Sequence, residues 1–324
     1  MRGTGRLDDS RDALTEQVDE QLEQLTMFGV PPRREVGFNV YHDESGTYSP
    51  SGGDRWLLHG VLLVPTNRQA QFFAEMQAVR HDVDYCHQVH YRRLGKSATG
   101  PKGRCCAGWL SLYAARFSQW CFYHCLGVDT ESPAFSAERF REPHHAYNYF
   151  ARTAMVGGIA WCLSGHREVA LRFHSHCMVR SEADNFETYI PREVIGAIEE
   201  KRRQRPGRYP EIRLLADRVL LVDADPKTAD SGMREECELT QLTDLMTSGL
   251  MEALTAQSQR EGKLALADLI AGWVLDTRKP PWLQREELHR RFSVSCFPGP
   301  DGGFYNPALR VATRHQMRLF QISD

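Results

Sequence analysis

Residues 56–64, WLLHGVLLV, are almost entirely apolar and have the length of a β-strand. A strand with one face in water alternates apolar and polar side chains, whereas a strand covered on both faces does not need to. This segment therefore predicts a central strand in a sheet that is covered on both sides. Few architectures provide such a position, and most of them place helices on both faces of the sheet.

The rest of the chain alternates strand and helix patterns. Further strands are expected at 35–42, 120–128, 169–177, 212–222 and 292–297, and helices at 69–83, 107–118, 146–163, 184–203, 238–254 and 263–275. Two strands followed by an alternation of helices and strands predict an α/β fold with a mixed central sheet and helices on both faces. No repeat or linker interrupts the pattern, so we expect one domain over 35–324.

An N-terminal helical extension is predicted for residues 1–34. One apolar stripe runs along an otherwise charged helix, and it consists of Leu14, Val18, Leu22 and Leu25. Pro31 and Pro32 end this helix. An apolar stripe needs a partner surface, which is either the body of the same chain or a second copy, so the pattern leaves open a homo-oligomer formed through this helix.

Charge and hydropathy restrict the classes of partner. The formal net charge is −2, so any contact with nucleic acid has to come from local basic patches. The polar, acidic N-terminus lacks the apolar core of a secretory signal, and no run of eighteen apolar residues follows. We therefore expect a cytoplasmic protein without a membrane segment. Nine cysteines without regular spacing indicate reduced thiols rather than a disulfide framework.

The strand predicted at 35–42 ends in Asp43-Glu44-Ser45-Gly46, which places two carboxylates at a sheet edge. Carboxylate oxygens are the ligands that Mg²⁺ prefers, usually one or two of them together with water and substrate phosphate. Adjacent strand residues point to opposite faces, so Asp43 and Glu44 share an ion only if the chain turns between them. The alternative is an ordinary acidic turn.

Two acids on predicted helices are further candidates. Asp244 lies at the margin of an apolar stripe, beside the small residues Thr247 and Ser248, which leave room for another group. Asp268 is the only charged residue between 264 and 275. Either carboxylate can instead belong to a solvated helix face, and a buried Asp268 would need an ion-pair partner.

Basic residues gather in two segments. The first, 91–104, contains Arg92, Arg93 and Lys96 close to a tyrosine, and the second spans 201–208 at the end of a predicted helix. Cations at a helix C-terminus are favoured by the helix dipole alone. The first segment is therefore the better candidate for binding nucleic acid, because Lys and Arg in a loop can contact phosphates along a strand.

The order of several short motifs resembles the family known as domain of unknown function 3800. These motifs are Tyr41-His42-Asp43-Glu44-Ser45-Gly46, Val89-His90-Tyr91, Asp230-Ser231, Gln241-Leu242-Thr243-Asp244-Leu245 and Phe292-Ser293-Val294. They cover the chain from about residue 36 to residue 310.

This resemblance implies an RNase H-like domain over 35–324 with helical insertions. In that fold, acids from the first strand and from a late helix bind divalent metal for phosphodiester hydrolysis. Motif matching gives Asp43, Glu44 and Asp244 as catalytic residues, with Asp43 and Asp244 holding Mg²⁺ or Mn²⁺. The strand that usually supplies a further acid reads Leu171-Arg172-Phe173-His174-Ser175-His176 here. His174 is therefore a candidate ligand, and imidazole suits manganese better than magnesium.

The leading hypothesis is thus a metal-dependent nuclease, with Arg92, Arg93 and Lys96 binding an RNA or DNA substrate. An inactive RNase H-like module that binds nucleic acid or protein is the main alternative, because the strand acid is missing. A third hypothesis is an assembly protein organised by the N-terminal stripe.

Overall fold

The computed structural model describes residues 36–49, 52–95, 97–140, 142–176, 184–276 and 292–321, with side chains as far as residue 314. The predicted N-terminal extension and its apolar stripe lie outside these residues. Within the described ranges, no helix combines the length and the apolar character that crossing a membrane requires.

The described strands form one seven-stranded mixed sheet. They are β1 (Val36–Ser45), β2 (Trp56–Pro65), β3 (Phe122–Asp129), β4 (Glu168–His176), β5 (Glu211–Leu214), β6 (Leu220–Val222) and β7 (Phe292–Phe297). Their order is β5-β4-β1-β2-β3-β7, and β6 pairs directly with the later part of β4, at His174–His176. The β1–β2 and β2–β3 pairs are antiparallel, while β4 runs parallel to β1, β5 and β6. The strand β7 is parallel to β3.

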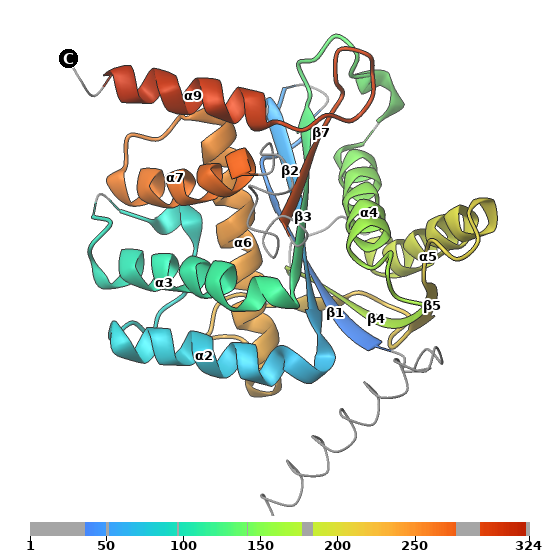
Figure 1. Ribbon diagram of the computed structural model, residues 1–324, viewed down its shortest axis with the longest axis horizontal. Coiled ribbons are helices and arrows are strands. Elements are labelled where there is room, and N and C mark those ends of the chain that lie inside the picture. The colour runs from blue at the N-terminus through green and yellow to red at the C-terminus, as the bar shows by residue number, and fades with distance from the viewer. Residues whose placement is uncertain are drawn as a thin grey trace, which may run out of the picture. The chain divides into compact units, whose positions relative to one another are not determined.

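Helices cover both faces of this sheet (Figure 1). One face carries α2 (Gln69–Asp82), α3 (Pro101–Ala115), α6 (Arg234–Thr255), α7 (Glu261–Asp276) and α9 (Ala308–Gln321). The other face carries α4 (Pro143–Cys162) and α5 (Phe186–Gln204). Each helical layer closes its own apolar core against the sheet. The predicted α/β class, with a mixed sheet and helices on both faces, is confirmed.

The strand β2 occupies the central position that its sequence predicts. All ten of its residues are buried. Leu58 and Leu62 pack into the core under α6, and Leu57 and Val61 pack into the core under α4. Successive strand residues point to opposite faces, so a strand that lies between two helical layers needs apolar side chains at nearly every position.

The structure differs from the predicted elements most at three places. The helix expected at 107–118 begins six residues earlier, at Pro101, because proline suits the first turn of a helix. The basic segment 91–104 is therefore only partly a loop. The strand expected at 212–222 is divided into β5 and β6 by a polar turn around Asp217. The helix α9 follows the last strand and was not predicted.

Candidate active site

The strand β1 places Asp43 and Glu44 on opposite faces of the sheet, as strand alternation requires. Ser45 shares the Asp43 face, and its hydroxyl oxygen lies 3.4 Å from Ser248 Oγ of α6. On the other face, Tyr147 of α4 donates a hydrogen bond of 2.8 Å from its hydroxyl to Glu44 Oε2. The two acids are therefore held by different helical layers.

A glycine allows α6 to lie against the sheet at this point. Gly60 of β2 pairs with Asp43 of β1. A Cβ atom at Gly60 would collide with Thr247 Oγ1 of α6 and would stand 2.8 Å from the hydroxyl of Tyr123. Close packing of the α6 backbone against β2 thus depends on the absence of this side chain, and it determines how near Asp244 comes to Asp43.

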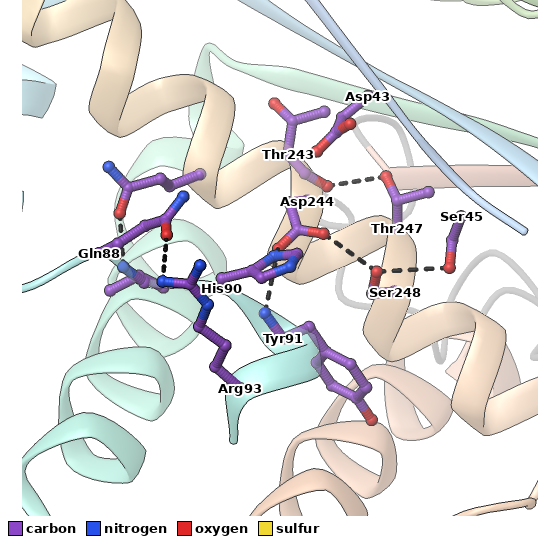
Figure 2. A network of polar contacts seen from close by, with 12 residues as sticks. Asp43, Ser45, Gln88, His90, Tyr91, Arg93, Thr243, Asp244, Thr247 and Ser248 are labelled. Carbon is purple, nitrogen blue, oxygen red and sulfur yellow. Dashed lines mark hydrogen bonds and ion pairs between the residues drawn. The ribbon is translucent and has the colours of Figure 1, made fainter. Parts of the chain in front are cut away.

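Asp244 is a buried carboxylate that accepts hydrogen bonds on both oxygens (Figure 2). Its Oδ2 atom accepts from His90 Nδ1 at 2.7 Å and from the Tyr91 backbone N–H at 3.0 Å. Its Oδ1 atom accepts from the Ser248 hydroxyl at 3.1 Å. Asp244 therefore fixes the backbone before η2 (Tyr91–Arg93) and orients the imidazole ring of His90.

The segment 85–91, which carries His90, is attached to α6 at two further points. Gln241 Oε1 accepts the Val89 backbone N–H at 2.6 Å. Arg80 uses all five of its N–H donors here: Nε and Nη2 bond Glu238 Oε2, Nη2 also bonds Gln241 Oε1, and Nη1 bonds the carbonyls of Tyr85 and His87. Glu238, Gln241 and Asp244 are three positions apart, so they follow one face of the helix.

A cavity of about 1260 Å³ opens at this end of β1. Its lining includes Asp43, Glu44 and Asp244, three further acids (Glu142, Asp184 and Asp225), five histidines among which are His59, His90 and His176, and also Tyr147, Arg92 and Arg93. Of these residues, Asp43, Glu44, Asp244 and both arginines were selected from the sequence. The fold therefore brings together residues from β1, from α6 and from the segment around η2.

Electrostatic repulsion is concentrated on Asp43. Burial, followed by the charges of Glu44 and Asp244, raises the pKa of Asp43 well above its usual value, and Arg92 only partly opposes this. A buried carboxyl that is repelled by two neighbouring carboxylates is costly to ionise. A cation beside Asp43 and Asp244 would offset part of that cost, and a strongly raised carboxyl pKa in a cavity is typical of functional sites.

The oxygen atoms of Asp43 and Asp244 suit a hard cation. Asp43 Oδ1 accepts the Glu44 backbone N–H at 2.9 Å, and the described residues provide no hydrogen bond to Oδ2. Asp244 Oδ1 has one donor and retains a second lone pair. In the part of the chain that the structure describes, no three His, Cys, Asp or Glu side chains are arranged to hold a metal. A hard cation at this place would therefore have two carboxylates at most as protein ligands, with water completing its coordination, as Mg²⁺ often does.

The structure does not bring His174 to the cavity. Its ring is buried and stacks on Tyr41 at a centroid distance of 4.8 Å, with Nε2 3.4 Å from Asn39 Oδ1. Burial, with a smaller effect of Arg172, lowers the pKa of His174 to about 3. Two residues further along β4, His176 does line the cavity.

Asp268 and Lys96 were also selected from the sequence. Asp268 is half-buried in α7 and does not line the cavity. Lys96 lies outside the described residues.

Sequence reasoning missed several polar residues of the cavity. His90 was noted only as part of a motif, although it makes the shortest contact with Asp244. His59 also lines the cavity, and its Nδ1 atom lies 3.1 Å from Nε2 of His42, which is fully buried behind it. The available signal was the presence of histidines within otherwise apolar strands, because a buried polar group needs a specific partner.

No protein-family model matches this chain, and no curated protein matches it. The resemblance described above therefore depends on the order of its motifs.

Proposed function

We propose that this chain is a metal-dependent nuclease that hydrolyses nucleic-acid phosphodiester bonds. The observation that supports this most directly is that Asp43 and Asp244 line one cavity, although they are about two hundred positions apart in the sequence. Their charges are close enough for Asp244 to raise the pKa of Asp43. Arg92 and Arg93 border the same cavity, where they can contact a phosphate backbone.

The proposal includes an RNase H-like fold for the domain. It is supported by the elements that carry the two acids, since Asp43 lies near the end of the first described strand and Asp244 lies on a late helix. The resemblance implies the same placement. The sheet arrangement, an antiparallel β1–β3 unit extended by parallel β4 and β5, is compatible with it.

In this proposal Asp43 and Asp244 hold Mg²⁺ or Mn²⁺, and Glu44 adds negative charge from the other side of β1. A divalent ion in such a site stabilises charge on phosphoryl oxygens and makes bound water more acidic. Tyr147 keeps the Glu44 carboxylate in position through its hydroxyl. Asp43 and Asp244 must be ionised to hold the cation. The cation would relieve the repulsion between their charges, and this relief would contribute to its binding free energy.

His90 is the proposed proton acceptor. When its Nδ1–H donates to the Asp244 carboxylate, the neutral ring presents Nε2 as a free lone pair. The ring lines the cavity, and no hydrogen bond to Nε2 forms within the described residues. A histidine oriented by a carboxylate in this way can take a proton from a nucleophile and return it to a leaving group.

Arg92 and Arg93, with Lys96 nearby in the sequence, are the proposed substrate-binding residues. Contacts of this kind are made to phosphate and carry little information about base identity. We therefore expect the protein to recognise the phosphate backbone of its substrate and not a particular base sequence.

A specific observation favours a second candidate function, a catalytically inactive module that binds nucleic acid or protein. Residues 171–176 of β4, where the resemblance implies a further acid, contain His174 and His176 and no carboxylate. His174 is moreover buried behind Tyr41. A parent protein that binds nucleic acid but has neither metal affinity nor cleavage activity would support this candidate.

The test compares Asp43→Asn and Asp244→Asn with Asp268→Asn. Asp268 is a matched control because, like Asp244, it is an aspartate within a helix, but it does not line the cavity. We expect the first two variants to lose Mn²⁺ affinity and cleavage by more than about 100-fold, since even outer-shell partners of a metal are worth 10- to 100-fold. Cleavage is measured in Mg²⁺ and in Mn²⁺, and binding by calorimetry. An active Asn variant at position 43 or 244 would exclude the proposed function.

Two further predictions from the sequence remain proposals. They are a cytoplasmic location and self-association through residues 1–34. Deleting residues 1–30 should abolish self-association in sedimentation experiments and leave nucleic-acid affinity unchanged.

A further inference from the structure

A second, smaller cavity of about 350 Å³ adjoins the candidate active site and shares Gly46 and Arg92 with it. Its wall is formed by residues from β1, β2, η2, α6, α7 and α9. Cations outnumber carboxylates among the lining residues by five to two, and the cations are Arg55, Arg92, Lys263, Arg310 and Arg314. A chain with a net charge of −2 therefore concentrates positive charge at one place beside its acidic site.

Most of these cations have no ion-pair partner in the described part of the chain. Arg55 is the exception, because it forms a two-point ion pair with Asp129 at 3.0 and 2.9 Å. The other four cations form no ion pair with any residue of the described ranges. Of the two lining acids, Asp54 accepts hydrogen bonds from Thr47 and Glu252 accepts one from the backbone of Ser258. An anion in this cavity would meet several available donors.

Two of the five cations are held in place by contacts with aromatic rings. Lys263 Nζ lies 5.2 Å from the centre of the Tyr91 ring, and the Arg310 guanidinium lies 4.6 Å from the centre of the Trp56 ring. Tyr91 is itself fixed, since its N–H bonds Asp244 and its hydroxyl bonds the Lys263 carbonyl at 3.0 Å. A ligand that binds these donors would find them already ordered, which lowers the entropic cost of binding.

Neighbouring positive charges act on Lys263. Burial comes first, and the charges of Arg260 and Arg92 come next, in lowering the pKa of Lys263. A bound anion would offset this repulsion.

We propose that this cavity binds a phosphate group of the nucleic-acid strand other than the one that is cleaved. The inference rests on the proposed function and adds a second contact point for the same substrate. Lys and Arg side chains are the usual donors to phosphate. Because Arg92 borders both cavities, a backbone that leaves the acidic cavity can pass directly into the basic one.

The test uses the double variant Lys263→Gln/Arg314→Gln. Neither residue lines the candidate active site. The matched control, Arg205→Gln/Arg208→Gln, removes the same charge from exposed positions after α5, in the opposite helical layer. The probe is a fluorescein-labelled single strand of about twelve nucleotides, titrated by anisotropy against the full-length protein in EDTA at several salt concentrations.

We expect the Lys263/Arg314 variant to bind more weakly. The slope of log K against log salt should become shallower by about 0.7 to 1.4, which corresponds to one or two lost phosphate contacts on a single strand. The control should keep the parent slope. With bis(p-nitrophenyl) phosphate and Mn²⁺, a diester too small to reach both cavities, the variant should keep the parent kcat and KM.

Each outcome decides a separate point. A variant whose salt slope equals that of the parent would overturn the proposed phosphate site. A shallower slope in a protein that cleaves no diester would refute the nuclease and retain the phosphate site. Inorganic phosphate provides the third arm: if it raises the Tm of the parent but not of the variant, while the oligonucleotide slopes stay equal, the cavity takes a free phosphate and the assignment to a strand is wrong.

Discussion

The buried ion pair between Arg80 and Glu238 supports the segment that carries His90, and its removal gives a quantitative prediction. Both side chains are only 7% exposed, and Arg80 Nη2 lies 2.9 Å from Glu238 Oε2. Glu238→Gln keeps the shape of the side chain and removes the charge, so the Arg80 cation remains buried without a counter-ion. Breaking a buried pair in this way costs about 3–5 kcal/mol. That is a large part of the 5–15 kcal/mol that stabilises a typical domain.

The opposite change, Arg80→Met, should be costly for a different reason. Burial raises the pKa of Glu238 even in the presence of Arg80, so the remaining carboxyl can take up a proton when the cation is removed. The main cost is the loss of the bonds to the carbonyls of Tyr85 and His87, at about 1 kcal/mol each. Once Arg80 is absent, Glu238→Gln removes no ion pair. The double variant should therefore be more stable than additivity predicts by about 2 kcal/mol or more.

Urea denaturation followed by tryptophan fluorescence measures this cycle, because the Arg80 guanidinium lies 4.7 Å from the ring centre of Trp109. Hydrogen exchange adds a local measurement: the Val89 amide, which bonds Gln241, should exchange faster in Glu238→Gln. A cost below about 1 kcal/mol for Glu238→Gln, or strict additivity in the double variant, would refute the reasoning.

Three further outcomes are expected. In EDTA, the stability of the parent should fall as the pH rises above the unfolded Asp pKa of about 3.9, because the raised pKa of Asp43 makes the folded state bind its proton more tightly. Thermal melts at a series of pH values measure this decline, and Asp43→Asn should lack it. Parallel curves for parent and variant would contradict the prediction. Gly60→Ala should cost about 1–3 kcal/mol in urea denaturation and weaken Mn²⁺ binding, because α6 has to move away from β2; an unchanged Mn²⁺ affinity would argue against this. Arg92→Gln/Arg93→Gln should flatten the salt dependence of single-strand binding by about 1.4, and an unchanged slope would return these arginines to a solvated surface.

Local patterns were sufficient for most of the elements. The continuous apolar run 56–64 indicated a strand covered on both faces, and the stripe of Leu239, Leu242, Met246 and Leu250 follows the helical period of 3.6 residues; each is buried in the structure. The strand period also correctly separated Asp43 from Glu44. Boundaries were less certain where the pattern is weak, as at the start of α3 and in the turn between β5 and β6.

The histidine of β4 shows what the sequence could not determine. His174 and His176 point to the same face, and only the pairing register distinguishes them. The register pairs Tyr41 with His174, so His174 stacks beside Tyr41 while His176 reaches the level of Asp43. Strand register is fixed by side-chain packing on both faces and by the paths of the connecting segments, which local periodicity does not contain.

The sequence by itself determined which residues are candidates, because the residue types, their periodicity and the end of an apolar strand are local properties. It supplied Asp43, Glu44 and Asp244, and it supplied the basic residues around Arg92. The tertiary structure decided which of them share a cavity, and it added His90 through its bond to Asp244. Contacts between residues so far apart in the chain arise only when α6 packs on β1 and β2, and this packing depends on surfaces from the whole domain.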